Sequence, residues 1–171
     1  MLKKTRLFIG ALCLAAFLFS AGCDTSTGSG LLLYTKDSTI PLPAALTGKW
    51  LSPMGDEYEI SAAKFTAGYG GVAGYSGNIV HVRDDGAGGG TGYITFQYTM
   101  NTLSYGSPVG SFCVLYWENF SDGIGTADMC VANDGAPGDS GRPTQEEAEA
   151  EFTIGDGDDY YYGLDSFTRS P

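Results

Sequence analysis

Basic residues are scarce in this chain. Nine lysines and arginines stand against 20 acidic residues, and the formal net charge is −11. Nucleic acids and anionic lipid headgroups attract proteins through basic side chains, so this balance argues against both as partners. The single histidine, His81, has no Ser/His/Asp set, cysteine nucleophile or HExxH motif to work with. We therefore expect a protein that is not an enzyme, with His81 as an ordinary core or surface residue.

Long hydrophobic runs are also lacking, and none reaches the length of an ordinary membrane span. The apolar run 7–19 follows three basic residues within 1–6, which is the order found in a secretory signal peptide. The small residues 20–22 come directly before Cys23. They resemble the lipobox of bacterial lipoproteins, in which the cysteine is lipidated, although that motif usually has Leu where Ser20 stands. The sequence thus predicts a signal peptide over residues 1–22 and a lipid anchor on Cys23.

The segment after Cys23 is small and polar, with an apolar exception at 31–34 that either packs on the domain or adds an edge strand. We expect residues 23–45 to be a flexible tether and 46–171 one domain. Loss of residues 1–22 removes three basic and no acidic residues, which takes the charge to −14. The expected location is the cell envelope, at the outer membrane or cell surface. The periplasmic face of the inner membrane is the alternative, because Asp24 resembles a retention signal.

Cysteine is scarce too, because only Cys113 and Cys130 remain after Cys23. They stand in two expected strands, 110–119 and 124–131, on either side of a turn. If that turn is centred on Ser121 and Asp122, the two cysteines face each other. The sequence therefore predicts a structural disulfide in an oxidising compartment. The same register places Phe112, Val114 and Tyr116 toward the core, with the cysteines, Leu115 and Trp117 on the opposite face.

Glycine and aromatic residues are plentiful, with 26 Gly, 11 Tyr and 9 Phe, which favours strands and turns. Apolar and polar residues alternate over 56–60, 75–83, 91–99 and 160–169, and a shorter strand is expected at 64–66. The Gly-rich run 68–77 is read as a loop or a strongly bent strand. Thr144 and Glu147 form a capping box, which predicts a helix to about Phe152 with Ala148 and Phe152 facing inward. The fold class is all-β, with about eight antiparallel strands and one short helix before the last strand.

Gly48, Lys49 and Trp50 resemble the Gly-x-Trp that opens the barrel of lipocalins and other calycins. In that group the Trp plugs one barrel end, and an Arg near the end of the sheet packs over it. Arg169 is in the matching place. The order of segments from residue 46 to 169, including the Thr-x-Glu-Glu-Ala helix at 144–153, resembles uncharacterised lipocalin-like lipoproteins of spirochaetes. The resemblance implies a lipocalin-like barrel and a tether, and it implies no particular ligand.

Aromatic side chains are the candidates for lining an apolar ligand site, with plain core as their alternative role: Trp50, Tyr58, Phe65, Phe96, Tyr98, Phe112, Tyr116 and Tyr162. No cofactor or metal is expected. Asp156, Asp158 and Asp159 offer oxygen ligands, but they do not follow the EF-hand pattern and are read as an acidic turn. Glu57 and Glu59 share a face and are expected to be solvated.

Two functions remain open at this point. The first is an envelope lipoprotein whose barrel binds a small apolar ligand. The second is a surface interaction or structural lipoprotein with a barrel filled by side chains, in which a protein partner contacts the exposed segments 68–77 and 133–143. They differ in whether the barrel leaves space for a ligand.

Overall fold

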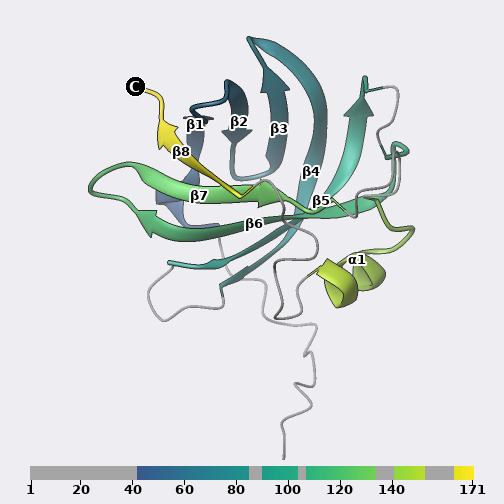
Figure 1. The fold of residues 1–171 in the computed structure, drawn as a ribbon. Coiled ribbons are helices and arrows are strands. Elements are labelled where there is room, and N and C mark those ends of the chain that lie inside the picture. Colours follow the sequence, from purple (N-terminus) through teal and green to yellow (C-terminus); the bar gives the residue numbers. More distant parts are fainter. Residues whose placement is uncertain (1–41, 85–89, 104–106, 134–140, 153–163) are drawn as a thin grey trace, which may run out of the picture. The chain divides into compact units, whose positions relative to one another are not determined.

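The structure of the protein is a computed structural model. It describes residues 42–84, 90–103, 107–133, 141–152 and 164–171. Eight strands form a closed antiparallel barrel in which each strand pairs with its neighbours in the chain and the last pairs with the first (Figure 1). The expected all-β barrel with one late helix is confirmed. The predicted signal peptide, Cys23 and the tether up to residue 41 lie outside the described residues.

The strands follow the expected order, with boundaries that differ by a few residues. The barrel consists of β1 (Gly48–Leu51), β2 (Asp56–Ile60), β3 (Lys64–Tyr69), β4 (Val72–Asp84), β5 (Gly92–Asn101), β6 (Phe112–Ser121), β7 (Thr126–Val131) and β8 (Asp165–Arg169). A 3₁₀ helix, η1 (Ala44–Leu46), precedes β1, and α1 (Gln145–Phe152) precedes β8. The barrel belongs to a compact unit that spans Thr35–Pro171. Because this unit holds the closed sheet and its core, we expect a chain beginning at Asp24 to fold without the residues before it.

The Gly-rich run 68–77 forms a bent strand pair and not a loop. It supplies the end of β3 and the start of β4, and the pairing shifts at Gly68 and again at Gly77. A Cβ at Gly77 would lie 2.6 Å from a ring carbon of Phe96. A Cβ at Gly68 would lie 2.4 Å from the carbonyl oxygen of Val72. Glycine is therefore needed where the sheet bends most sharply.

One end of the barrel, which we call the closed end, is sealed around Trp50. Its ring is fully buried, and its indole N–H donates to the carbonyl of Leu46 in η1 at 2.9 Å. The guanidinium of Arg169 in β8 lies over this ring, 5.0 Å from the centroid, and donates to the carbonyl of Ala45. The expected packing of Arg169 over Trp50 is thus present. Together these contacts join the start of the domain to its last strand.

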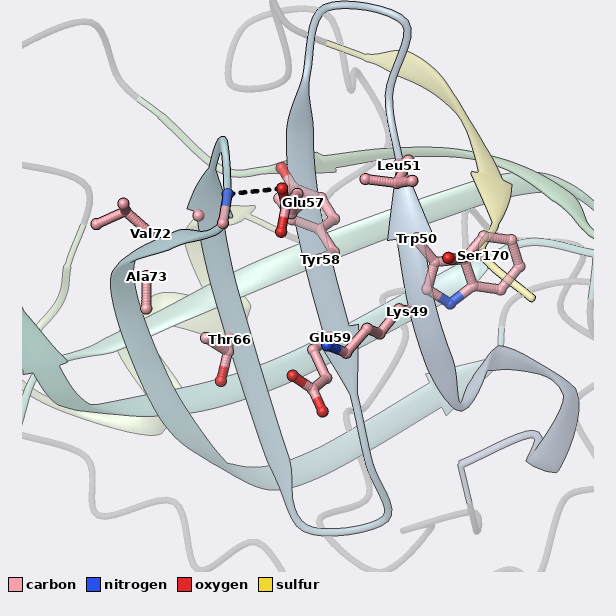
Figure 2. A pocket seen from close by; sticks show the side chains of 12 residues that line it. Lys49, Trp50, Leu51, Glu57, Tyr58, Glu59, Thr66, Val72, Ala73 and Ser170 are labelled. Carbon is pink, nitrogen blue, oxygen red and sulfur yellow. Dashed lines mark hydrogen bonds between the residues drawn. The ribbon is translucent and has the colours of Figure 1, made fainter.

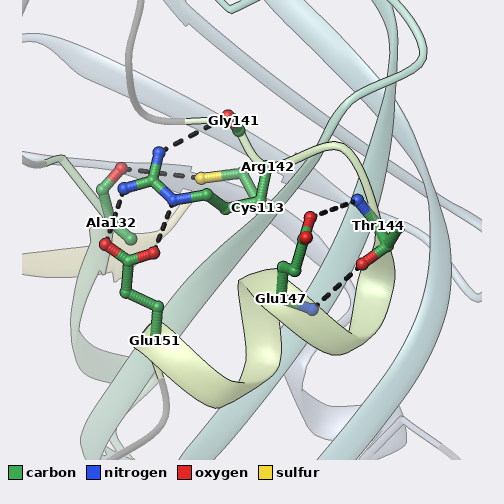
Figure 3. A network of polar contacts seen from close by, with 7 residues as sticks. All are labelled: Cys113, Ala132, Gly141, Arg142, Thr144, Glu147 and Glu151. Carbon is green, nitrogen blue, oxygen red and sulfur yellow. Dashed lines mark hydrogen bonds and ion pairs between the residues drawn. The ribbon is translucent and has the colours of Figure 1, made fainter.

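Helix α1 forms as the capping box predicts. The backbone N–H of Glu147 donates to the Thr144 hydroxyl at 3.2 Å, and the Thr144 N–H donates to the Glu147 carboxylate at 3.3 Å (Figure 3). Ala148 and Phe152 are buried, as expected. The helix contacts β5 and β6 from outside the barrel. None of the described residues forms a helix long and apolar enough to cross a membrane.

Arg142 fixes α1 to the sheet just before the helix begins. Its guanidinium makes two hydrogen bonds to the carboxylate of Glu151, at 2.6 and 2.7 Å (Figure 3). It also lies 4.8 Å from the ring centroid of Phe152. Its backbone exchanges two 2.8 Å hydrogen bonds with Phe112 in β6. A bidentate pair on a half-buried arginine is a geometrically demanding contact. It holds the short helix against the outer face of β6.

The predicted register of the β6–β7 hairpin is wrong. Tyr116 pairs with Cys130, and Leu115 pairs with Val131, a shift of three residues from the expected pairing. The reason is local: the turn occupies 122–125, where Gly125 takes a φ of 72° and donates to the Ser121 carbonyl at 2.7 Å. Asn119, with a φ of 51°, adds an irregularity in β6. A left-handed position near the end of the loop favours glycine, and Gly125 meets that requirement.

This shift also corrects the predicted faces and the predicted disulfide. A shift by an odd number of residues exchanges the two faces of a strand. Cys113 lies opposite Phe96 and points into the barrel, whereas Cys130 lies opposite Tyr116 on the outer face. Both thiols are free and buried, so the structure does not contain the predicted disulfide. Phe112 and Tyr116 point outward, and the inward residues of β6 are Cys113, Leu115 and Trp117.

The closed end provides a first test of the structure. We expect Arg169→Ala to lower the free energy of unfolding by about 1–2 kcal/mol, because it removes a partly exposed cation–π contact and a hydrogen bond to a carbonyl. Urea unfolding followed by tryptophan fluorescence measures this. Lys49→Ala is the matched control, because it removes an exposed cation next to Trp50 and should change stability by less than about 0.5 kcal/mol. Equal effects of the two changes would contradict the packing described.

The state of the cysteines is tested by alkylation of a chain that begins at Asp24. In denaturant without reductant, we expect both Cys113 and Cys130 to react, because neither is in a disulfide. In the folded protein, Cys113 should be unreactive, since its thiol is fully buried. Mass spectrometry of the intact chain counts the modified thiols. If both cysteines react in denaturant only after a reductant is added, the protein contains the disulfide that the sequence predicts.

Candidate functional site

The inside of the barrel is filled by a chain of touching aromatic rings. Phe65 packs on Phe96 with centroids 4.9 Å apart, and on Tyr58 at 5.2 Å. Tyr58 stacks on Phe167 at 4.4 Å, with 19° between the ring planes. Trp50, Trp117 and Met129 are fully buried nearer the closed end. Side chains therefore occupy the part of the barrel below Tyr58.

The opposite end, which we call the open end, has a pocket of about 370 Å³. Its floor consists of Tyr58, Ala67 and Tyr75, whose positions in the register point them inward. Tyr75 lies 5.6 Å from Tyr98, centroid to centroid, so the floor continues the aromatic chain. The walls come from the start of β2, from the strand ends next to the β3–β4 turn and from the residues after β5: Asp56, Gly68, Tyr69, Val72, Ala73, Gly74, Thr102 and Leu103. We call this the mouth pocket.

Few polar groups face the mouth pocket. Asp56 stands at its edge, where its backbone N–H and carboxylate hydrogen-bond the Ser52 hydroxyl at 3.0 and 3.3 Å. The Thr102 hydroxyl donates to the Gly74 carbonyl at 2.8 Å. The phenol groups of Tyr58, Tyr69 and Tyr75 are the other polar side-chain groups of the lining residues. This is an apolar, aromatic pocket with a small number of polar groups that can fix the orientation of a ligand.

Burial changes the titration of the groups below the pocket. It raises the pKa values of the Tyr58, Tyr75 and Tyr98 phenols well above the ordinary value of 10.0. It raises the pKa of the Cys113 thiol from 9.0 to about 12. All four groups are therefore uncharged at neutral pH and remain hydrogen-bond donors. Cys113 is protonated and enclosed, so it does not have the properties of a reactive nucleophile.

A second hollow, of about 340 Å³, lies on the outer face of β1, β2 and β3 (Figure 2). The side chains of Lys49, Glu59 and Thr66 line its lower part, and Glu57 lies near the β3–β4 turn. The Glu57 carboxylate accepts the Gly71 backbone N–H at 2.7 Å. This outer groove is polar and open. Glu59 is exposed, as predicted, whereas Glu57 is half-buried and supports the turn.

His81 is buried beneath α1. Its Nδ1 lies 2.8 Å from Oε1 of Glu149, and the Gln145 side-chain amide donates to the same oxygen at 2.8 Å. Both His81 and Glu149 are less than 9% exposed. Of the two positions expected for His81, core or surface, the structure shows the core, and its contacts connect β4 to α1.

The predicted ligand-binding aromatics divide into three groups. Trp50, Tyr58, Phe65, Phe96 and Tyr98 point into the barrel, and of these only Tyr58 lines the mouth pocket. Phe112 and Tyr116 point outward, where Tyr116 packs on Tyr93 at 5.1 Å. Tyr162 lies outside the described residues. Five of the eight candidates therefore lie in the interior of the barrel, one of these five lines the mouth pocket, and their role in ligand binding stays a prediction.

Sequence reasoning missed the residues that line the mouth: Ala67, Tyr69, Val72, Tyr75 and Leu103. Most of them lie within or beside the Gly-rich run 68–77, which was considered as an exposed functional segment. The sequence pattern that indicates these residues is a run of glycines with single apolar residues between them. Such a run bends a strand and turns its apolar side chains toward a barrel opening.

The described residues contain no group of three or more His, Cys, Asp or Glu side chains placed to hold a metal ion. The acidic turn at Asp156, Asp158 and Asp159 lies outside them. Comparison with protein-family models, with curated proteins and with solved structures gives no match to this chain. Function is therefore inferred from the geometry of the barrel.

The raised pKa values predict a loss of stability in alkali. The pKa of the Cys113 thiol is higher in the folded protein than in the unfolded chain, where it is 9.0. Below pH 9 the thiol is protonated in both states and the free energy of unfolding is unaffected. As the pH rises from 9 toward the pKa of the folded state, only the unfolded chain loses the proton, and the free energy of unfolding falls. Above pH 9, the contribution of Cys113 should fall by at most about 1.4 kcal/mol per pH unit, and the tyrosines should add to this above pH 10. Urea unfolding from pH 7 to 11 measures the slope.

Two variants separate ionisation from lost packing. Cys113→Ala should reduce the alkaline slope, whereas Val114→Ala, a fully buried neighbour without an ionisable group, should lower stability equally at every pH. An unchanged slope in Cys113→Ala would mean that the thiol does not titrate with unfolding.

Proposed function

We propose that this protein is an envelope lipoprotein, held by lipid on Cys23, whose lipocalin-like barrel binds a small and mainly apolar ligand in the mouth pocket. The observation that carries the proposal is the pocket itself. It combines an aromatic floor, about 370 Å³ of space and few polar groups, which are general properties of small-molecule sites. The ligand rests on Tyr58 and Tyr75 near the open end, because aromatic side chains fill the barrel below them.

The polar groups around the pocket indicate the chemistry of the ligand. The phenols of Tyr58 and Tyr75 stay protonated, so each can donate a hydrogen bond to a ligand oxygen. Asp56 at the edge disfavours an anionic group, as does the overall charge of −11. An uncharged ligand with an aromatic or aliphatic body and one hydrogen-bond acceptor fits these groups best.

Two features support the lipocalin-like assignment. The packing of Arg169 over Trp50 at 5.0 Å reproduces the arrangement that the resemblance implies. The closed barrel of eight strands in chain order agrees with the same architecture. The anchor and the envelope location rest on the sequence of residues 1–23.

The alternative function is a structural or interaction lipoprotein with a filled barrel. It is favoured by the complete burial of Phe65, Phe96 and Trp117 inside the barrel. In that case the mouth pocket holds only water, and the exposed residues around it contact a protein partner. The two functions differ in whether a small apolar molecule competes for the mouth.

Binding of the neutral fluorescent probe N-phenyl-1-naphthylamine tests the ligand site on a chain that begins at Asp24. We expect saturable binding with a blue-shifted emission. Leu103→Trp, which fills the pocket from its wall, should weaken the affinity by about tenfold, equivalent to about 1.4 kcal/mol. Native mass spectrometry of the same protein shows whether a ligand is already bound after purification.

Val80→Trp is the matched control, because Val80 and Leu103 are each 37% exposed but Val80 does not line the mouth pocket. Its affinity for the probe should equal that of the unmodified chain. Absence of saturable binding, or equal effects of the two tryptophans, would favour the filled barrel.

A further inference from the structure

Among the described residues that line the mouth pocket, Asp56 is the one that carries a charge. It stands at the start of β2, directly opposite Tyr69 of β3, so the two side chains are neighbours on the same face of the sheet. Tyr58, two residues further along β2, lies on that face as well and belongs to the floor of the pocket. The carboxylate at the edge is therefore next to one tyrosine of the wall and one of the floor.

The ring of Tyr69 lies against the β1–β2 turn, beside Asp56. A Cβ at Gly55, the residue before Asp56, would lie 3.1 Å from a ring carbon of Tyr69 and 3.7 Å from its hydroxyl oxygen. Glycine at position 55 thus allows the ring to approach the backbone closely. Tyr69 is 65% exposed, so a large part of its surface is open to a ligand that enters the pocket.

The charge of Asp56 is held in place by a neutral group. The hydroxyl of Ser52, a buried residue, donates to the carboxylate at 3.3 Å and accepts the Asp56 backbone N–H at 3.0 Å. No Lys, Arg or His is among the described residues that line the mouth pocket, and Lys49 lines the outer groove instead. Burial, the Cys130 thiol and the Asp56 carboxylate, in that order, raise the pKa of Tyr58. The carboxylate therefore acts on the floor of the pocket.

Further carboxylates stand at the open end. The Glu57 carboxylate, on the outer face of β2, accepts the Gly71 backbone N–H in the β3–β4 turn at 2.7 Å (Figure 2). In an antiparallel barrel alternate connections lie at the same end, so the β7–β8 connection lies at the open end with the β1–β2 and β3–β4 turns. That connection carries α1, whose Glu146 and Glu147 are exposed. Together with the net charge of −11, these groups attract a cation to the mouth.

We propose that the mouth pocket binds organic monocations, in which an aromatic or aliphatic body carries one ammonium group. The body lies on Tyr58 and Tyr75, and the ammonium group lies at the edge between the Asp56 carboxylate and the Tyr69 ring. This inference rests on the proposed function and extends it. The uncharged body described there satisfies the floor of the pocket, and a positive group on its outer end adds the contact with Asp56.

A carboxylate beside an aromatic ring is a suitable environment for an ammonium group. The carboxylate accepts a charge-assisted hydrogen bond from it, and the negative face of the ring attracts its charge. Because Asp56 and Tyr69 are both exposed, the ammonium group keeps part of its hydration, and the large cost of burying an ion is avoided. Exposed pairs of this kind are weak, so we expect an advantage of about fivefold to tenfold in affinity over a neutral analogue.

Two fluorescent probes that differ by one ammonium group test the inference. Dansylcadaverine carries a primary ammonium group at the end of a pentyl chain, and N-pentyl dansylamide is its neutral counterpart. Fluorescence titration of each probe with the chain that begins at Asp24 gives two dissociation constants and their ratio. We expect dansylcadaverine to bind about five to ten times more tightly at low ionic strength. Added salt should reduce this ratio, because it screens an exposed ion pair.

The ratio of the two affinities separates recognition of the charge from a general change in the pocket. Asp56→Asn removes the charge with little change in size and should bring the ratio close to one, whereas a deformed pocket would weaken both probes alike. Tyr69→Leu should lower the ratio by about threefold, because it removes the ring and keeps an apolar side chain. Glu59→Gln is the matched control, because Glu59 is an exposed carboxylate on the outer face of the same strand. It changes the net charge equally and should keep the ratio of the unmodified chain.

The outcomes keep this inference separate from the proposed function. A high ratio that Asp56→Asn abolishes and Glu59→Gln keeps supports the cation site. Saturable binding of both probes with a ratio near one leaves the ligand site in place and overturns the preference for a cation. Equal loss of the ratio in Asp56→Asn and Glu59→Gln also overturns it, because the attraction would then come from the overall charge. Absence of saturable binding by either probe removes the ligand site itself, and the cation site with it.

Discussion

The barrel depends on a short seam between its first and last strands. β1 and β8 pair through only two residue pairs, Trp50 with Arg169 and Leu51 with Thr168. Backbone pairing over two residues is marginal, so side-chain contacts must hold the seam closed. Arg169 does this by covering the Trp50 ring and reaching the Ala45 carbonyl. Because the interior rings pack against strands on both sides of this seam, the aromatic core and the shape of the open end depend on it.

The sequence predicts most of the fold because polar and apolar residues alternate along several strands. In β2 and β5 the alternation of residues identifies both the strand and its neighbours, and the capping box at Thr144 and Glu147 identifies the helix. Arg169 was placed by resemblance and not by periodicity. These elements are determined by residues that are close together in the sequence. The closure of the sheet follows from the need to pair every edge.

The β6–β7 hairpin could not be predicted because both faces of β6 are apolar. Cys113 and Leu115 face the barrel, and Val114 faces α1; all three are fully buried. The pattern therefore does not say which face is inside, and the turn decides the register. Two glycines, Gly123 and Gly125, could occupy the left-handed position, and only the folded chain shows that Gly125 does. Because α1 covers the outer face of β6, that face is also apolar, and β6 does not show the alternation of polar and apolar residues that identifies the inner face of a strand.

The same reasoning explains why the candidate site was only partly foreseen. Aromatic residues were expected to line a ligand cavity, but rings as large as Trp50, Phe65 and Phe96 fill an eight-stranded barrel themselves. Among the described residues, the mouth pocket lies where the wall is bent by glycine and lined by small residues such as Ala67 and Gly74. The bend between β3 and β4 therefore explains why the mouth pocket, with Asp56 at its edge, lies at the opening and not in the aromatic core.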